Sequence, residues 1–268
     1  MGSRVHRVCL FVLAFSFTLL PSTSVLEKSI KSKWELIFWN VGQGDFASLT
    51  GPHTCWVFDP GGSLRIPPIL VQTLRTSCPG RKITLSVSHF DKDHIKNYGS
   101  LLKNFSITDV YVSHRDPRSK FGQKFLILMA AKKINIHVVG SGFRPSGPLS
   151  FLCLWPINNG ELGHLENNFS LVWHLKINST SILITGDLPT KMERYPTWPQ
   201  VEILKVAHHG SRTSTSSDFL NELKPKECVV SVGKNSYGHP SIETLKRLKM
   251  ARCAILRTDK LGPIKFEL

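Results

Sequence analysis

Four side chains that commonly bind metal ions lie within one hexapeptide, directly after an apolar segment. The segment, residues 83–88, has the length and residue types of a buried strand. The four side chains that follow it are His89, Asp91, Asp93 and His94. Two imidazoles and two carboxylates crowded at a strand end repel and desolvate one another unless a cation compensates them. The alternative is a solvated acidic turn before a helix, with Asp93 as its N-cap. We therefore predict a metal site here, with further ligands supplied by other parts of the chain.

Other strand-like segments also end in residues that bind metals. One apolar run ends at Asp187, a second runs into His208 and His209, and His239 stands in a Gly-Pro turn. Each alone has an ordinary explanation, as a helix cap, a solvated turn or a structural histidine. Together they supply the several nitrogen and oxygen ligands that hydrolytic metals need at one sheet edge.

The apolar segments alternate with helical patterns, which indicates an α/β fold. The expected strands are residues 34–39, 46–50, 54–58, 83–88, 109–113, 134–139, 149–155, 170–177, 182–185, 201–206, 228–232, 254–256 and 264–268. The expected helices are residues 67–76, 95–105, 120–133, 218–223 and 241–247, the last capped by Ser241. Two halves of similar style, with site residues at strand ends, favour two sheets packed face to face with helices outside, a four-layer αββα sandwich.

The charge balance of the chain is strongly basic. Lys and Arg number 34 against 19 Asp and Glu, a formal net charge of +15. An excess of this size favours polyanionic partners, either nucleic acid or an anionic membrane surface. Charge alone does not specify a reaction.

The first 24 residues have the pattern of a secretory signal. Arg4 and Arg7 precede an apolar stretch, residues 8–20, and Ser24 offers a small residue for cleavage. We therefore expect a signal peptide at residues 1–24, one folded domain at residues 25–268, and a secreted or periplasmic protein. The alternative is an uncleaved N-terminal membrane anchor. No later segment is apolar enough to span a bilayer, so no stable membrane span is expected in the mature chain.

The cysteine count fits an oxidising compartment, in which disulfides form. The cysteines after the signal segment are Cys55, Cys78, Cys153, Cys228 and Cys253. Their number is odd, so at least one thiol lacks an internal partner. Cys228 and Cys253 begin two apolar runs that neighbouring strands could bring together, and the pairing stays open.

Several short motifs occur in a characteristic order over nearly the whole chain after residue 33. They are residues 41–45 (VGQGD), 59–62 (DPGG), 88–94 (SHFDKDH), 168–172 (NFSLV), 185–188 (TGDL), 208–214 (HHGSRTS) and 237–240 (YGHP). In their order and spacing the chain resembles the metallo-β-lactamase-type domain of the bacterial competence protein ComEC. The resemblance implies the αββα fold and a metal-dependent hydrolase.

The resemblance also implies a cofactor, two divalent metal ions. His89 and Asp91 would serve one ion, and Asp187 would bridge both. The implied ligands of the second ion are Asp93, His94 and either His208 or His209. Asn168 stands near the place where the wider superfamily has another histidine. An oxygen-rich ligand set shifts the preferred metal from zinc toward manganese.

The implied reaction is hydrolysis of DNA phosphodiester bonds with a water activated by the two ions. Asp93 or Asp187 would orient the water, and His239 would protonate the leaving oxygen or stabilise the transition state. The expected partner is therefore DNA, held through its phosphate backbone. The predicted substrate contacts are Ser211, Arg212, Thr213, Ser214 and Asn168.

The chain departs from the family pattern at two places. Asn40 stands where the family usually has Asp, and Lys96 and Asn97 stand where it usually has two glycines. Lys96 adds positive charge beside the predicted site. The membrane channel region of a competence protein is also missing, so a stand-alone exported relative is expected.

Two other functions stay open. One is hydrolysis of a small ester, lactone or β-lactam, because one fold can host several chemistries. The other is a non-enzymatic DNA-binding component with a structural metal. The basic charge and the motif that begins at His208 favour the DNase.

Overall fold

The computed structural model describes residues 33–78, 80, 82–147, 150–157, 163, 165–195 and 197–268. The predicted signal segment, residues 1–24, lies outside these residues. Residues 32–268 form one unit. Among the described residues, no helix has the length and apolar character that a bilayer crossing requires.

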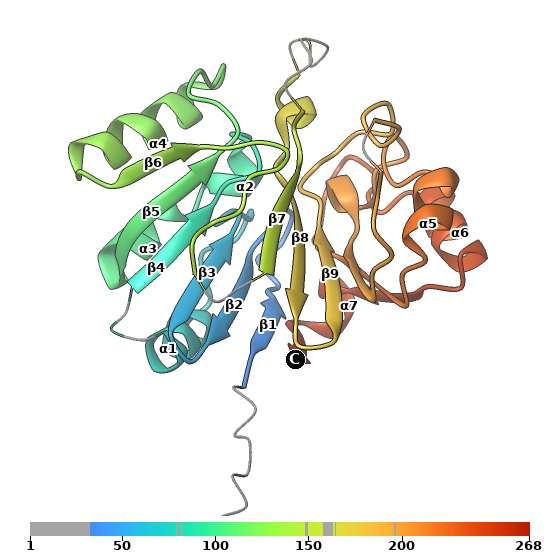
Figure 1. The fold of residues 1–268 in the computed structure, drawn as a ribbon, viewed down its shortest axis with the longest axis horizontal. Helices are drawn as coiled ribbons and strands as arrows, with labels where there is room; N and C mark the ends of the chain where they lie inside the picture. The colour runs from blue at the N-terminus through green and yellow to red at the C-terminus, as the bar shows by residue number, and fades with distance from the viewer. Residues whose placement is uncertain are drawn as a thin grey trace, which may run out of the picture. The chain divides into compact units, whose positions relative to one another are not determined.

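The first sheet contains seven strands in the order β13-β1-β2-β3-β4-β5-β6 (Figure 1). Strands β13 to β3 are antiparallel neighbours, whereas β3 to β6 are parallel. Their bounds are β1 (Glu35–Phe38), β2 (Ala47–Gly51), β3 (Thr54–Phe58), β4 (Lys82–Ser86), β5 (Ser106–Val112), β6 (Asn135–Val138) and β13 (Ile264–Glu267). The helices on its outer side are α1 (Pro68–Ser77), α3 (Tyr98–Asn104) and α4 (Lys120–Ala131). Leu74, Leu101 and Phe125 of these helices share one core with Leu85 of the sheet.

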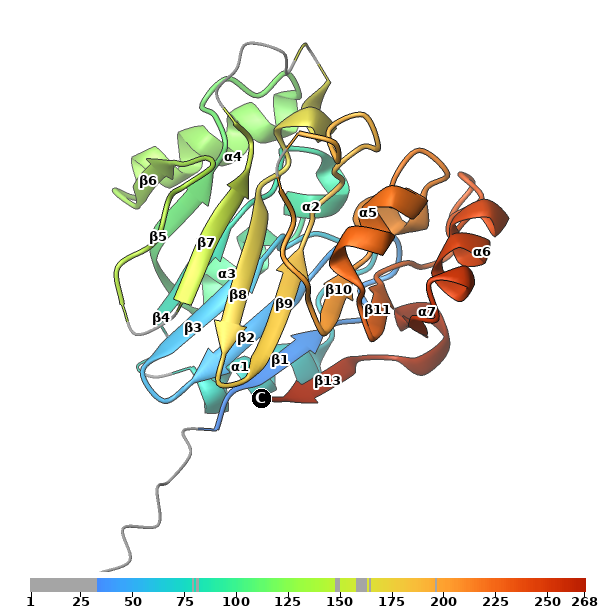
Figure 2. The ribbon, with the colours of Figure 1, turned by 45° about the vertical axis from the view of Figure 1, so that its right-hand side comes forward.

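The second sheet contains six strands in the order β12-β11-β10-β9-β8-β7. Their bounds are β7 (Ser150–Trp155), β8 (Val172–Ile177), β9 (Thr180–Ile184), β10 (Ile203–Lys205), β11 (Glu227–Val230) and β12 (Ala254–Arg257). The helices beside it are α5 (Ser217–Leu223) and α6 (Ile242–Met250) (Figures 1 and 2). Phe219 and Leu248 of these helices share a core with Leu204 of the sheet. Short helical turns complete the chain: α2 (Lys92–Ile95), η2 (Glu166–Phe169), η3 (Ala207–Gly210) and α7 (Thr258–Leu261).

A third core lies between the two sheets, which face each other in Figure 2. Trp56 of β3 lies with its ring 5.1 Å from Phe151 of β7 and 6.2 Å from Trp173 of β8. The indole of Trp173 donates a hydrogen bond to Ser86 of β4 at 2.7 Å. Large aromatic side chains bury much apolar area, so they hold the two sheets together. The predicted αββα sandwich is confirmed.

The local predictions differ from the structure mainly at helix ends. The predicted helix of residues 95–105 corresponds to α3, which begins at Tyr98, whereas Ile95 is the last residue of α2. Ser241 caps α6 as predicted, because its hydroxyl accepts a hydrogen bond from the Thr244 amide at 3.1 Å. The alternative in which Asp93 caps a helix is wrong, because Asp91 is the N-cap of α2 and Asp93 lies inside its first turn.

Two disulfides link four of the five described cysteines. Cys228 of β11 pairs with Cys253, which precedes the neighbouring strand β12, so the pairing left open by the sequence is present. Cys55 of β3 pairs with Cys78 after α1. Cys153 is the one described cysteine outside a disulfide, and it is buried.

We expect the Cys228–Cys253 disulfide to stabilise the second sheet. A Cys228→Ser, Cys253→Ser double variant should lose about 3 kcal/mol of unfolding free energy, because the crosslink restricts the unfolded chain. Urea denaturation of oxidised protein measures this loss. Added reductant should lower the stability of the wild type further than that of the variant, which retains only one disulfide. Equal denaturation midpoints for wild type and variant would contradict the prediction.

Candidate metal centre

The predicted ligands lie at the carboxyl ends of parallel strands. In the first sheet, β4 leads to His89 and then to α2, which holds Asp93 and His94. In the second sheet, the parallel strands β9 and β10 lead to Asp187 and to His209 in η3. The carboxyl ends of parallel strands share one edge of a sheet, so ligands distant in sequence meet there.

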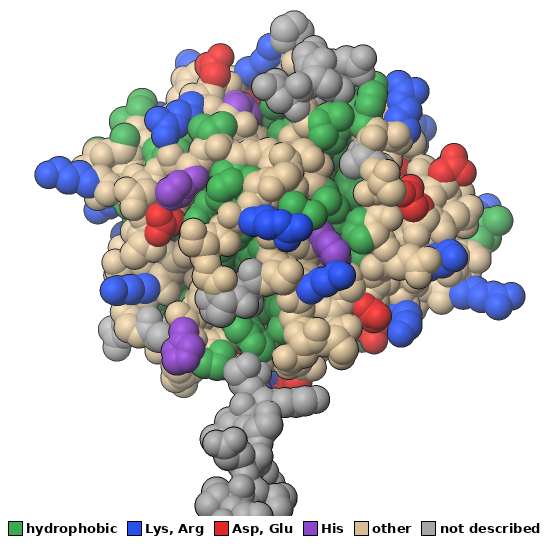
Figure 3. All heavy atoms as spheres, viewed as in Figure 1, with side chains coloured by type: hydrophobic (Ala, Val, Ile, Leu, Met, Phe, Trp, Pro, Cys, Tyr) green, Lys and Arg blue, Asp and Glu red, His purple; other side chains and the backbone are tan. Residues whose placement is uncertain are grey.

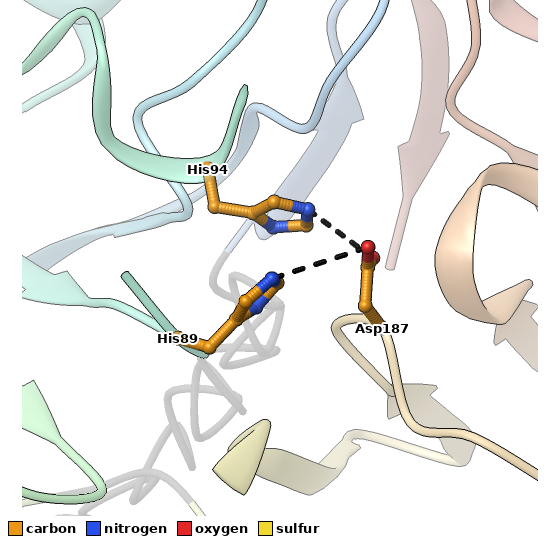
Figure 4. A group of neighbouring side chains, drawn as sticks. All are labelled: His89, His94 and Asp187. Atoms are coloured by element: carbon orange, nitrogen blue, oxygen red, sulfur yellow. Dashed lines mark ion pairs between the residues drawn. The ribbon is translucent and has the colours of Figure 1, made fainter. Parts of the chain in front are cut away.

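One group of ligands consists of His89, His94 and Asp187, whose polar atoms point toward one another (Figure 4). The Nε2 atoms of His94 and His89 lie 3.2 and 4.0 Å from the Asp187 carboxylate. All three residues are buried, and their ligand atoms lie within 4.8 Å of one another. Two imidazoles and one carboxylate at these separations can hold a divalent ion.

A second group shares His94 and adds Asp93 and His209. The Nε2 atom of His209 lies 3.3 Å from Asp93 Oδ2 and 3.7 Å from Asp187 Oδ2. His94 Nε2 can bind one ion only, so the two groups adjoin through the Asp187 carboxylate, whose Oδ1 lies 3.2 Å from His94 Nε2 and whose Oδ2 lies 3.7 Å from His209 Nε2. Such a layout suits two neighbouring ions that act on one substrate.

The geometry favours His209 over His208 as the ligand. Both residues have left-handed backbones, with φ of 50° and 53°, and Gly210 follows with φ of 80°. Left-handed conformations are strained for residues other than glycine and persist where surrounding structure enforces them. This turn buries His209 in the centre, whereas the His208 side chain is 28% exposed with its Nε2 3.6 Å from Asp187 Oδ2.

Hydrogen bonds to the far nitrogens fix the orientation of two imidazoles. His94 Nδ1 donates to Asp59 Oδ2 at 3.0 Å, and His209 Nδ1 donates to the Ser231 carbonyl at 2.9 Å. A histidine whose Nδ1 is committed in this way presents Nε2 to a metal. The backbone also packs closely near these ligands. A Cβ atom at Gly61 would overlap the carbonyl of Asp93, so this contact requires glycine.

Asp45, Asp59 and Lys205 also lie at the centre, although they were not predicted as ligands from the sequence. Lys205 is 2% exposed, and its ammonium contacts Asp45 and lies 3.8 Å from Asp187 Oδ1. It also donates to the Gly186 carbonyl at 2.7 Å. A lysine at the end of an apolar strand could have indicated this position from the sequence, because a buried charge needs a partner of opposite charge.

The electrostatics of the centre favour positive charge. Burial alone lowers the pKa of the His94 imidazole, but carboxylates around it, chiefly Asp187, raise that pKa well above its usual value. Burial opposes ionisation of Asp187, yet His94 and His209 hold its pKa well below the usual range. Burial also acts to lower the pKa of Lys205. The carboxylates of Asp45 and Asp187 outweigh this effect and raise the pKa above its usual value. A bound cation would meet the same demand for positive charge.

Unsatisfied buried atoms show that the residues fit a metal ion. The Nε2 atoms of His89, His94 and His209 and the Oδ1 atom of Asp187 are buried; ion-pair partners lie 3.2–4.0 Å away, but none of these atoms makes a well-formed hydrogen bond among the described residues. Buried polar atoms without partners are costly and therefore rare. Here they converge on one region and are nitrogen and oxygen donors that divalent ions accept.

The other predicted ligands and catalytic residues lie around this core. The Asp91 carboxylate lies 3.5 Å from His89 Nε2, but its side chain is 43% exposed. The His239 ring lies 5.4 Å from that of His208, and burial together with the nearby imidazoles lowers its pKa. Asn168 is buried in η2, where its backbone carbonyl accepts a hydrogen bond from the Trp155 indole at 2.7 Å.

The four remaining predicted substrate contacts form the loop after η3. Arg212 and Thr213 are exposed, whereas Ser211 and Ser214 are buried. The Ser214 hydroxyl donates to the Ala207 carbonyl at 2.8 Å. Ser214 therefore braces the loop, and of these four residues Arg212 and Thr213 are the ones that a substrate can reach.

Comparison with known proteins identifies the family. Residues 49–234 match the family described as the metallo-beta-lactamase superfamily. The chain belongs to this superfamily. Its fold typically binds divalent metals and supports metal-dependent hydrolysis. The predicted resemblance to a metallo-β-lactamase-type domain is confirmed.

Curated relatives include competence proteins. The chain is 28% identical over 260 residues to ComE operon protein 3 of Bacillus subtilis, a match that covers 88% of this chain and 33% of that protein. It is 26% identical over 269 residues to Recombination protein 2 of Haemophilus influenzae, covering 97% of this chain and 32% of that protein. The chain thus spans about one third of the length of these relatives.

Solved structures show the same fold. The metallo-beta-lactamase fold protein YhfI from Bacillus subtilis has a TM-score of 0.56 and 11% identity, covering 89% of this chain and 100% of that chain. Igni18, a metallo hydrolase from Ignicoccus hospitalis, also has a TM-score of 0.56, with 9% identity, covering 87% of this chain and 99% of that chain. At this identity the likeness shows the fold alone.

Proposed function

We propose that the protein is an exported metal-dependent DNase that hydrolyses phosphodiester bonds. The observation that carries the proposal is the pair of adjoining ligand groups, with the Asp187 carboxylate near both His94 and His209. Relatives named for competence and recombination support DNA as the substrate. The net charge of +15 supports it independently, because neutralised phosphates dominate binding to nucleic acid.

The proposed cofactor is two divalent ions, manganese or zinc. The proposed ligands are His89, Asp91, Asp93, His94, Asp187 and His209. When bound, such ions lower the pKa of a water molecule and neutralise charge on an attacked phosphate. Asp93 is suited to orient an attacking water, because its side chain is 35% exposed while the Asp187 carboxylate is buried.

The proposed role of His239 follows from its place near the centre. Its imidazole is half-buried, and its lowered pKa favours the neutral form at pH 7. A neutral imidazole keeps one ring N–H, which can donate a hydrogen bond to a phosphate oxygen or to the leaving oxygen. Arg212 and Thr213 supply further donors to phosphate oxygens.

Export is part of the proposal. The two disulfides, Cys55–Cys78 and Cys228–Cys253, support an oxidising compartment, because cytosolic thiols are kept reduced. The signal pattern in residues 1–24 agrees with a secreted or periplasmic location.

Cleavage of DNA after controlled metal loading tests the proposed function. The purified protein is stripped with chelator and supplied with Mn²⁺, Mg²⁺ or Zn²⁺ singly. We expect metal-dependent cleavage, with a His89→Ala variant at least about 100-fold slower, since even an outer-shell partner of a metal ligand is worth about 10–100-fold.

A matched control separates the effect of removing any histidine from the effect of removing a predicted metal ligand. His137 lies on β6 and pairs with Asp109 at 2.8 Å, outside the ligand groups of the described residues. A His137→Ala variant should cleave like the wild type. A folded, metal-bound wild type that cuts no DNA would refute the DNase and direct the search to small esters.

A further inference from the structure

A pocket of about 420 Å³ opens beside the candidate metal centre, and its wall carries three lysines. We name it the lysine pocket and define it by Lys92, Lys96, Lys234, Tyr237 and Asp93. All three lysines are exposed. Asp93 is also a member of the metal ligand groups, so the pocket and the centre share a wall.

The charge of the lysine pocket is unbalanced. Asp93 is the one carboxylate among its described lining residues, and that carboxylate faces His209 at 3.3 Å. Lys96 is held at the wall, because its ammonium donates to the Ser63 carbonyl at 2.7 Å. A pocket with excess positive charge attracts a polyanion at close range.

Tyr237 gives the lysine pocket an accessible aromatic face. The residue is 73% exposed, and its ring lies 5.7 Å from the His239 ring. The loop that carries it is braced by Asn235, whose Oδ1 accepts hydrogen bonds from the amides of Tyr237 and His239 at 3.1 and 3.0 Å. An exposed ring on a braced loop can stack a flat ligand at little entropic cost.

Two other basic hollows lack this combination. One, of about 500 Å³, is lined by Lys176, Lys224 and Lys226, and Glu202 also lines it. The other, of about 820 Å³, is lined by Arg65, Arg75 and Lys103. Neither contains an aromatic residue or a member of the ligand groups among its described lining residues. Figure 3 shows Lys and Arg spread over one face, so basic charge by itself marks no site.

We propose that the lysine pocket binds a segment of single-stranded DNA that continues from the metal centre, with phosphates against its lysines and an unpaired base on Tyr237. The inference rests on the proposed nuclease function and specifies its substrate. A base within a duplex already stacks on its neighbours, whereas an unpaired base is free to stack on an aromatic side chain. The pocket therefore favours single strands over duplex.

The first test measures binding without divalent metal, so that cleavage plays no part. Fluorescence anisotropy of a labelled 12-nucleotide oligothymidine reports the Kd at several salt concentrations. The triple variant Lys92→Gln, Lys96→Gln, Lys234→Gln should bind at least about tenfold more weakly. The slope of log Kd against log salt should fall by about 2, because each phosphate contact on a single strand contributes about 0.7.

A second hollow supplies the matched control. The variant Lys176→Gln, Lys224→Gln, Lys226→Gln removes the same charge from the hollow that holds Glu202. It should bind oligothymidine like the wild type. If both triple variants bound oligothymidine equally weakly, the proposed lysine pocket would be refuted, and the overall positive charge would explain the binding.

Tyr237 variants test the stacking. A Tyr237→Ala variant should bind oligothymidine about tenfold more weakly, whereas Tyr237→Phe should bind like the wild type. Binding of a 12-base-pair duplex should respond to neither change. Wild-type affinity of Tyr237→Ala for the single strand, or equal losses for single strand and duplex, would refute the proposal.

Failure of the proposed function is distinguishable from failure of this inference. If the wild type binds through the lysine pocket but cuts no DNA with any ion, the nuclease proposal is refuted and the binding site stands. If the wild type cuts DNA and all variants bind like it, the nuclease proposal stands and the binding site is refuted.

Discussion

An Asp187→Asn variant should lose tight metal binding and hydrolysis together. Asp187 contacts both ligand groups, with its carboxylate 3.2 Å from His94 Nε2 and 3.7 Å from His209 Nε2. Asparagine keeps the size of the side chain but removes its charge and one acceptor oxygen. We expect metal affinity and cleavage rate each to fall at least about 100-fold, the upper end of the effect of an outer-shell change. Titration of metal into stripped protein, followed by calorimetry, measures the affinity directly.

An exposed aspartate provides the control for this prediction. Asp116 lies on the surface, outside the ligand groups of the described residues. Asp116→Asn makes the same chemical change and should leave metal affinity unaltered. Wild-type metal affinity in Asp187→Asn would show that the ion binds elsewhere.

A Lys205→Met variant should be about 3–5 kcal/mol less stable than the wild type in the absence of metal. Methionine has a similar length and fills the same space, but it leaves the buried carboxylates of Asp45 and Asp187 without the ammonium between them. It also leaves the Gly186 carbonyl without its donor. Denaturation of chelator-treated protein measures the loss.

Divalent metal should narrow this difference in stability. A bound cation supplies positive charge to the same carboxylates, and removal of Lys205 also removes a repulsive neighbour from the centre. The metal-induced rise in stability should therefore be larger in Lys205→Met than in the wild type.

A surface lysine is the matched control. The Nζ atom of Lys226 lies 3.9 Å from Glu202 Oε1, and the Lys226 side chain is 76% exposed. Lys226→Met should therefore lower the free energy of unfolding by less than about 1 kcal/mol. Equal stabilities of Lys205→Met and wild type in chelator would contradict the pairing of Lys205 with Asp45.

Local features of the sequence determined the fold class and most of the candidate ligands. Apolar runs of strand length, each followed by ligand-type residues, indicated where β4 and β9 end and placed His89, His94 and Asp187 together. These predictions succeed because strand periodicity and side-chain chemistry are properties of short segments. Parallel pairing then brings strand ends to one edge whatever their separation along the chain.

Only the tertiary structure decided how the centre is completed. The choice of His209 over His208 depends on two left-handed backbone conformations that no short segment dictates. Lys205 joins the centre because a buried ammonium must meet carboxylates, and Asp45 comes from the loop between β1 and β2 of the other sheet. The lysine pocket likewise joins α2 to the loop that carries Tyr237. Orientation and charge pairing depend on long-range packing, and for that reason they could not be read from the chain alone.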